Sequence, residues 1–217
     1  MNIDRLEAWI EQGKGPWLVA LFGEDGETDP AWAPPEGTMP EWFARFISWM
    51  DAYSSTGERW FEFGRRLANA LRSRCPEHEW QRLDYAVRAT LLREAMAHTA
   101  DRAVTAACIL GVDLCERAAH GAMPSSAEFS TASEQARSAY EAPTVSGSSA
   151  YAAAATLEAV GYPYPAKYDL IEKIADAVNG AAVASEENQP AAREHCDRMI
   201  DRALKLLERS SGENDVR

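Results

Sequence analysis

Apolar side chains recur at intervals of three and four residues along most of this chain, a spacing that places them on one face of an α-helix. Leu6, Trp9 and Ile10 show this pattern near the start. Glycine and proline interrupt it at intervals typical of helix lengths. The sequence therefore predicts an all-α protein, either a compact multi-helix bundle or stacked helical hairpins, with little or no strand.

Helix boundaries are marked by recognisable end signals. Ser125 and Glu128 have the spacing of a capping box, in which each side chain satisfies a free amide at the helix start, and Thr38 and Glu41 repeat that spacing. Asn2 is placed to cap the first helix. Helices are expected at residues 3–12, 39–53, 58–74, 76–98, 101–119, 126–141, 151–160, 166–185 and 190–208, and a compact apolar turn or a brief helix is expected at residues 16–22.

Length and composition are those of an ordinary globular protein. The chain has 217 residues, 46% of them hydrophobic and 26% charged. A chain of this length buries roughly 70% of the surface that it exposes when unfolded. We expect a single helical domain over residues 1–209 and a polar tail at 210–217. An acidic, Pro-rich loop at residues 23–37 and a candidate flexible connection at residues 143–149 interrupt the helices.

The sequence also indicates where in the cell the protein is expected. The first residues lack the basic and apolar regions of a signal peptide, and no apolar stretch approaches the roughly 20 residues needed to span a bilayer. The four cysteines include no Cys-x-x-Cys pair, which argues against a zinc ribbon or a disulfide scaffold. We therefore expect a cytoplasmic protein with reduced thiols and no membrane partner.

The net charge limits the class of partner. It is −12, with 22 basic against 34 acidic residues, so the chain repels nucleic-acid phosphates and attracts basic proteins. Residues 1–37 alone carry eight acidic and two basic side chains, a net charge of −6. We expect no nucleic-acid partner and favour a protein with a basic surface. A high acidic charge also serves solubility alone.

The acidic loop holds the candidate partner-binding residues. Trp32 lies among prolines and acids, where helix periodicity does not demand a large ring. An exposed Trp32 surrounded by Asp25, Glu27 and Asp29 would anchor a basic protein by ring burial after electrostatic attraction. The alternative is that Trp32 packs the loop onto the body of the protein.

Two Glu-x-x-x-His pairs are candidate metal ligands. Glu94 and His98 lie four residues apart on one expected helix, as do Glu116 and His120 on the next. Together they would offer two imidazoles and two carboxylates to a transition metal. The di-iron pattern of helical bundles is instead Glu-x-x-His. Solvent-facing or capping roles are therefore the favoured interpretation, and no cofactor is expected.

Seven aromatic residues of the first half could line a ligand cavity, but their helical spacing favours the core of a hairpin. They are Trp42, Phe43, Phe46, Trp49, Trp60, Phe61 and Phe63. No nucleophile motif, phosphate-binding loop or dinucleotide fingerprint occurs, so catalytic residues cannot be assigned.

These observations favour a cytoplasmic helical protein-binding module over an enzyme. By analogy of size, helix content and acidity, the partner could be a basic effector that the chain neutralises as immunity proteins do. The alternatives are a metal-dependent helical-bundle enzyme and a sensor that encloses a small ligand. Assembly with further copies of the same chain stays open.

Overall fold

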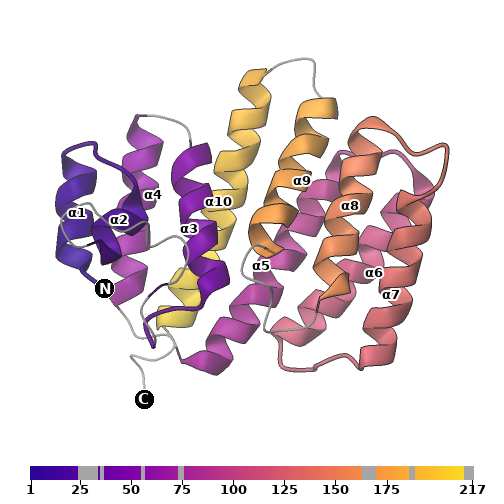
Figure 1. The fold of residues 1–217 in the computed structure, drawn as a ribbon, viewed down its shortest axis with the longest axis horizontal. Coiled ribbons are helices and arrows are strands. Elements are labelled where there is room, and N and C mark those ends of the chain that lie inside the picture. The colour runs from indigo at the N-terminus through magenta and orange to yellow at the C-terminus, as the bar shows by residue number, and fades with distance from the viewer. Residues whose placement is uncertain are drawn as a thin grey trace. The chain divides into compact units, whose positions relative to one another are not determined.

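The computed structural model describes residues 1–23, 34, 37–54, 57–72, 76–162, 170–185 and 189–212. These residues form ten helices and no strand, which confirms the predicted all-α class (Figure 1). The helices are α1 (Ile3–Glu11), α2 (Trp17–Phe22), α3 (Glu41–Tyr53), α4 (Glu58–Arg72), α5 (Glu77–Ala97), α6 (Arg102–Ala119), α7 (Ser126–Tyr140), α8 (Gly147–Gly161), α9 (Leu170–Ser185) and α10 (Gln189–Gly212). Across the described residues, none of these helices is both long and apolar enough to span a bilayer.

Most of the predicted caps form. The side chain of Asn2 accepts a hydrogen bond from the amide of Arg5 at 3.0 Å, and Ser125 and Glu128 make both bonds of the capping box. The capping box predicted at Thr38 is wrong. Pro40 takes the cap position of α3 with an extended backbone (φ −70°, ψ 150°) and makes no side-chain cap bond, so Thr38 lies two residues outside the helix.

Helix α8 also differs from its predicted bounds. It begins at Gly147 rather than at residue 151, so the connection from α7 occupies residues 141–146 instead of the predicted 143–149. Polar Ser148 and Ser149 continue the helix because the apolar face of α8 packs against α7 and α9. Tertiary packing thus overrides the weak helix propensity of this stretch.

The chain divides into two compact units, with boundaries inside α5 and α10. Unit 1 comprises Met1–Trp80 and Cys196–Arg217, and unit 2 comprises Gln81–His195. The expectation of a single domain over residues 1–209 stays a prediction. Unit 2 contains the residues from which a function is inferred below.

In unit 1, α1 packs against α2 and α4, and α2 packs against α3. The predicted aromatic core is present, with five of the seven rings buried and those of Trp60 and Phe61 partly exposed. The carboxylate of Asp51 accepts hydrogen bonds from the Trp60 indole at 2.7 Å and from the backbone amide of Trp17 at 2.9 Å. These bonds join α2, α3 and α4.

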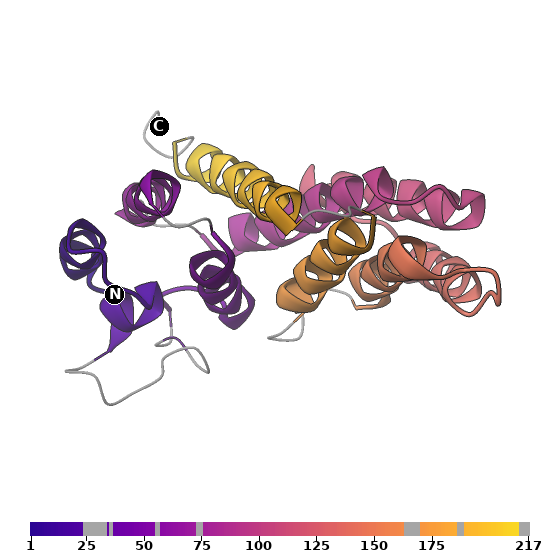
Figure 2. The ribbon, with the colours of Figure 1, turned by 90° about the horizontal axis from the view of Figure 1, so that it is seen from above.

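In unit 2, α8 lies between α7 and α9, and α6 packs against both α7 and α8 (Figures 1 and 2). The contacts use small side chains, as the Ala-rich sequence of α8 predicts. A methyl group added to Gly111 of α6 would lie 2.9 Å from Leu92 and 3.2 Å from Val160. The helices of unit 2 therefore approach closely, which leaves little freedom for side chains between them.

A buried ion pair fixes α5 within unit 2. Asp84 and Arg88 lie one turn apart on α5, and both side chains are fully buried. Their closest atoms are 2.5 Å apart, and a second nitrogen of Arg88 donates to the carbonyl oxygens of Ala159 and Tyr162 at 3.0 and 2.6 Å. The guanidinium group thus joins the middle of α5 to the C-terminal end of α8.

Candidate metal centre

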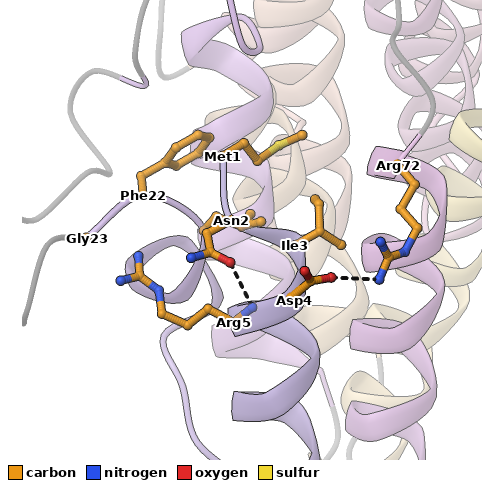
Figure 3. Close-up of a pocket in the computed structure, with 9 residues that line it drawn as sticks. Met1, Asn2, Ile3, Asp4, Arg5, Phe22, Gly23 and Arg72 are labelled. Carbon is orange, nitrogen blue, oxygen red and sulfur yellow. Dashed lines mark hydrogen bonds and ion pairs between the residues drawn. The ribbon is translucent and has the colours of Figure 1, made fainter.

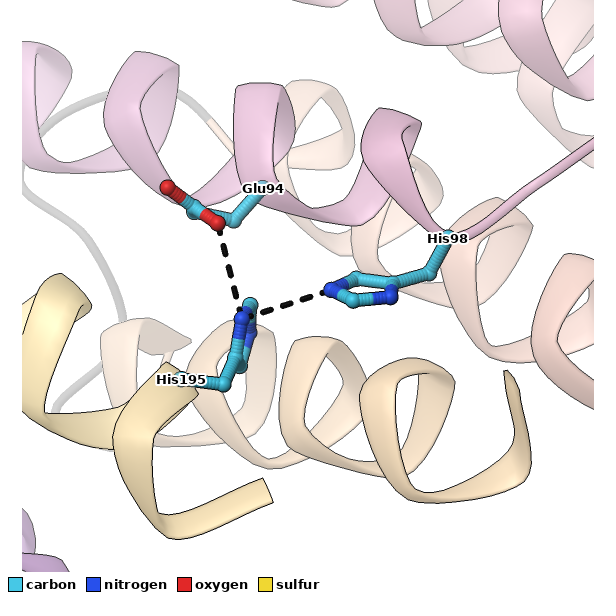
Figure 4. A group of neighbouring side chains, drawn as sticks. All are labelled: Glu94, His98 and His195. Atoms are coloured by element: carbon cyan, nitrogen blue, oxygen red, sulfur yellow. Dashed lines mark hydrogen bonds and ion pairs between the residues drawn. The ribbon is translucent and has the colours of Figure 1, made fainter. Parts of the chain in front are cut away.

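Three metal-ligating side chains converge within unit 2. Glu94 lies in the last turn of α5, His98 directly follows the end of that helix, and His195 comes from α10 (Figure 4). The spacing of four residues puts Glu94 and His98 on the same side of the helix. One ligand atom from each of the three residues lies within 4.8 Å of the other two. Among the described residues, this is the one group of three or more His, Cys, Asp or Glu side chains with such spacing.

Nδ1 of His195 is the common point of contact. It lies 3.3 Å from Nε2 of His98 and 3.5 Å from a carboxylate oxygen of Glu94. The two imidazole rings are nearly perpendicular, with an interplanar angle of 82° and centroids 4.7 Å apart. In Figure 4 the carboxylate and the edge of the His98 ring both face this nitrogen.

These separations fit ligands that share a metal ion. With metal–ligand bonds of about 2.0–2.1 Å, the corners of a tetrahedral zinc site lie about 3.3–3.4 Å apart. The two measured separations, 3.3 and 3.5 Å, agree with this value. Both exceed the common N–H···O distance of about 2.9–3.0 Å. The two separations thus fit ligands of one metal ion, and they are also within the range of a long hydrogen bond and an ion pair.

The number of protons on Nδ1 of His195 also bears on whether a metal ion fits this cluster. Nδ1 of His195 carries at most one proton, yet it faces a carboxylate oxygen and a second imidazole nitrogen. One proton makes one well-aligned bond, so it serves only one of these two atoms well. A cation accepts an electron pair from all three atoms together. The three donor atoms are therefore compatible with a shared metal ion.

Burial and the helix end also favour a cation. The side chain of His195 is fully buried and Glu94 is 6% exposed, whereas His98 is partly exposed. A buried carboxylate interacts more strongly with a positive charge than an exposed one does. The cluster also lies where α5 ends, at Ala97, and the free carbonyl groups of a helix C-terminus carry partial negative charge. Each of these features stabilises a positive ion.

The structure separates the two predicted Glu-x-x-x-His pairs. Glu116 forms an ion pair with Arg93, and Nδ1 of His120 lies 2.7 Å from the backbone oxygen of Glu116. Of the four candidate ligands, the cluster thus includes Glu94 and His98 and does not include Glu116 and His120. The Arg93 guanidinium gives the Glu116 carboxylate a closer partner than any histidine.

Sequence reasoning missed His195. The cluster joins positions 97 residues apart, which no spacing pattern within one helix connects. The sequence gives one weak indication that His195 is a candidate ligand. The chain has only four histidines, and His195 lies on an amphipathic helix. Periodicity assigns such a residue to a helix face but does not pair it with a residue on another helix.

The predicted partner-binding residues Asp25, Glu27, Asp29 and Trp32 lie outside the described residues. Their role stays a prediction. Cys115, in unit 2, is unsuited to nucleophilic chemistry, because burial raises the pKa of its thiol to about 12.

A surface pocket of about 540 Å³ lies in unit 1, lined by residues 1–5, 21–23 and 72 (Figure 3). Its two guanidinium groups are engaged by protein oxygens. Arg5 donates to the carbonyl oxygens of Val19 and Ala20, and Arg72 pairs with Asp4 at 3.2 Å and also with Glu7. Because the charges of both guanidinium groups are already compensated, this pocket gives less indication of a ligand than the cluster of unit 2 does.

Comparison of this chain with protein-family models, curated proteins and solved structures finds no match. The geometry of Glu94, His98 and His195 is therefore the observation from which a function can be inferred.

Proposed function

We propose that this protein binds one divalent transition-metal ion through Glu94, His98 and His195. The observation that carries this proposal is the convergence of three ligand atoms within 4.8 Å of one another, two of whose separations, 3.3 and 3.5 Å, fit a tetrahedral site. This proposal differs from the sequence-based expectation of no cofactor. Of the four candidate ligands named from the sequence, it includes Glu94 and His98.

The donor atoms favour a particular class of ion. Imidazole nitrogen suits Zn²⁺, Fe²⁺, Ni²⁺ and Cu²⁺, whereas Mg²⁺ and Ca²⁺ prefer ligand sets made entirely of oxygen. Two imidazoles and one carboxylate therefore select a borderline transition metal. Co²⁺ has similar coordination preferences and reports on its ligands by absorption spectroscopy, so it is a useful probe.

Titration of the metal-free full chain with Zn²⁺ tests this function. Isothermal calorimetry and elemental analysis are expected to show one Zn²⁺ per chain, with no comparable binding of Mg²⁺ or Ca²⁺. The variants Glu94→Gln, His98→Ala and His195→Asn each remove one ligand. Each should weaken Zn²⁺ binding by more than about 100-fold. Loss of a residue that only supports a ligand, without contacting the metal, typically weakens binding by about 10- to 100-fold.

Glu116→Gln and His120→Ala are the matched controls. They change the same two residue types in the last turn of α6 and directly after its end, outside the cluster. Both should bind Zn²⁺ as the unaltered chain does. A Zn²⁺ affinity that is equal in the His98→Ala and His120→Ala variants would disprove the assigned site.

A second candidate function is binding of a basic protein in the cytoplasm. It is supported by the net charge of −12 and by the acidic excess of residues 1–37. Reversing the charges of Asp25, Glu27 and Asp29 should reduce the affinity for proteins captured from the native host. An unchanged set of partners with unchanged affinities would refute this function, including its immunity-type form.

A further inference from the structure

We infer that a second pocket of unit 1 binds a small, uncharged aromatic molecule. The pocket has a volume of about 490 Å³, and it is lined by residues 37–40, which precede α3, and by residues 76, 77 and 80 at the start of α5. Pockets for small molecules typically measure roughly 300–1,000 Å³ and are mostly apolar. This pocket shares no lining residue with the metal site, so the inference goes beyond the proposed function.

Two prolines give the pocket walls that lack free polar groups of the backbone. Pro40 and Pro76 directly precede α3 and α5, and neither has an amide hydrogen. Their carbonyl oxygens are engaged as well. That of Pro40 accepts hydrogen bonds from two amides of α3 at 3.0 and 3.2 Å, and that of Pro76 accepts from two amides of α5 at 3.0 and 3.1 Å. These walls therefore present mainly carbon to a ligand, and their fixed rings lose little freedom when it binds.

Trp80 and Met39 supply the aromatic and thioether walls. The ring of Trp80 is held in an aromatic cluster, with its centroid 4.9 Å from that of Phe43 and 6.3 Å from that of Trp42. A ring fixed in this way is a rigid contact for an aromatic ligand, and such ring pairs gain more than their buried area alone provides. The flexible side chain of Met39 adapts to irregular shapes and makes favourable contacts with aromatic rings. These two walls favour an aromatic ligand over an aliphatic one.

The charges around the pocket favour an uncharged ligand. Among its described lining residues, Glu77 alone is charged and none is basic. An anionic ligand would therefore lose water without gaining a positive partner there, and the net charge of −12 also disfavours it. A cationic ligand would gain little from Glu77, because this side chain is exposed and ion pairs in solvent contribute little.

The pocket is open to solvent beside Gly37. This residue is exposed, and its backbone is left-handed, with φ at +76°. Among the described residues, no atom lies within 4 Å of a methyl group added at Gly37. A small ligand can therefore enter at this edge without displacing a described side chain.

Titration of the full chain with indole, a small uncharged aromatic probe, tests the inference. Calorimetry is expected to show one saturable site, and proton–nitrogen NMR should show a shift of the Trp80 indole N–H, which is assigned by its loss in Trp80→Phe. Indoleacetate, the anionic analogue, should bind at least about tenfold more weakly, because its charge finds no partner. Tryptamine, the cationic analogue, should bind no more tightly than indole.

Two matched variants locate the site. Glu77→Trp places a ring at the pocket itself and should weaken indole binding by more than about tenfold, because the new ring competes for the same space. Glu58→Trp is the control. It makes the same substitution at the first residue of α4, which is also exposed but does not line the pocket, and it should bind indole as the unaltered chain does. Circular dichroism checks that both variants are folded.

Each contrary outcome overturns the inference. The absence of saturable indole binding would refute the pocket as a ligand site, as would equal binding by the folded Glu77→Trp and Glu58→Trp variants. Binding that leaves the Trp80 resonance unshifted would place the ligand elsewhere, and this measurement needs no change at the pocket. Tighter binding of tryptamine or indoleacetate than of indole would refute the uncharged class of ligand.

Discussion

Nδ1 of His195 lies 3.3 Å from Nε2 of His98, although 97 positions separate the two residues in the chain. The contact brings the beginning of α10 to the end of α5, and Glu94 completes the group from 3.5 Å away. A bound ion would cross-link these two helix segments within unit 2. Several consequences for stability can be measured.

Metal binding should stabilise the folded chain against denaturation. A ligand that binds only the folded state contributes about 2.7 kcal/mol when its free concentration is about 100 times the dissociation constant. Urea unfolding followed by circular dichroism, with Zn²⁺ present and absent, measures this gain. His98→Ala should lose the gain at the same Zn²⁺ concentration, and His120→Ala should keep it. Equal stabilisation of both variants by Zn²⁺ would contradict metal binding through His98.

Breaking the buried pair of α5 should destabilise the protein strongly. Asp84→Ala leaves the guanidinium of Arg88 buried without its carboxylate, which costs about 3–5 kcal/mol. Glu116→Gln removes one side of the exposed pair with Arg93 and should cost no more than about 1 kcal/mol. Urea midpoints of the two variants give the comparison. Similar losses would show that the Asp84–Arg88 pair contributes no more than a surface pair.

Close helix packing makes Gly111 intolerant of a larger side chain. Gly111→Ala places a methyl group 2.9 Å from buried Leu92, and overpacking of this kind typically costs about 1–3 kcal/mol, partly offset by the higher helix propensity of alanine. We expect a lower thermal midpoint. Gly161→Ala is the control, since among the described residues its methyl group would meet Ser133 at 3.9 Å, and should be neutral or stabilising. A stabilised Gly111→Ala variant would refute the close approach.

Helix α7 should lose its N-terminal stabilisation in acid. The Arg117 guanidinium, followed by the amide and hydroxyl of Ser125, holds the pKa of Glu128 down to about 2 from an ordinary value of 4.5. The folded-state pKa is thus below the unfolded value. The stabilisation is therefore complete above about pH 4.5 and is lost as the pH falls towards 2.

Two variants test this pH dependence. Glu128→Gln should flatten the change of stability between pH 4.5 and 2, as measured by urea unfolding at each pH. Arg117→Met should move the pKa of Glu128, followed by NMR, back towards its ordinary value. If the Glu128→Gln variant shows the full wild-type pH dependence, the capping carboxylate is not its source.

Local sequence determined the helical elements and most of their ends. Asn2, Ser125 and Glu128 act through amides only three positions away, so their roles could be predicted without knowledge of the fold. The spacing of Glu94 and His98 likewise placed both on one side of a helix. The failure at Thr38 is also local, because Pro40 occupies the cap position two residues later.

Only the tertiary structure decided which helix faces meet. It brought His195 to Glu94 and His98, and it left Glu116 with Arg93 instead. Helical periodicity specifies which side of a helix a residue occupies, but the partner across the interface depends on the packing of distant segments. The candidate metal centre is a product of that packing, because its three ligands come from segments that local interactions alone cannot bring together.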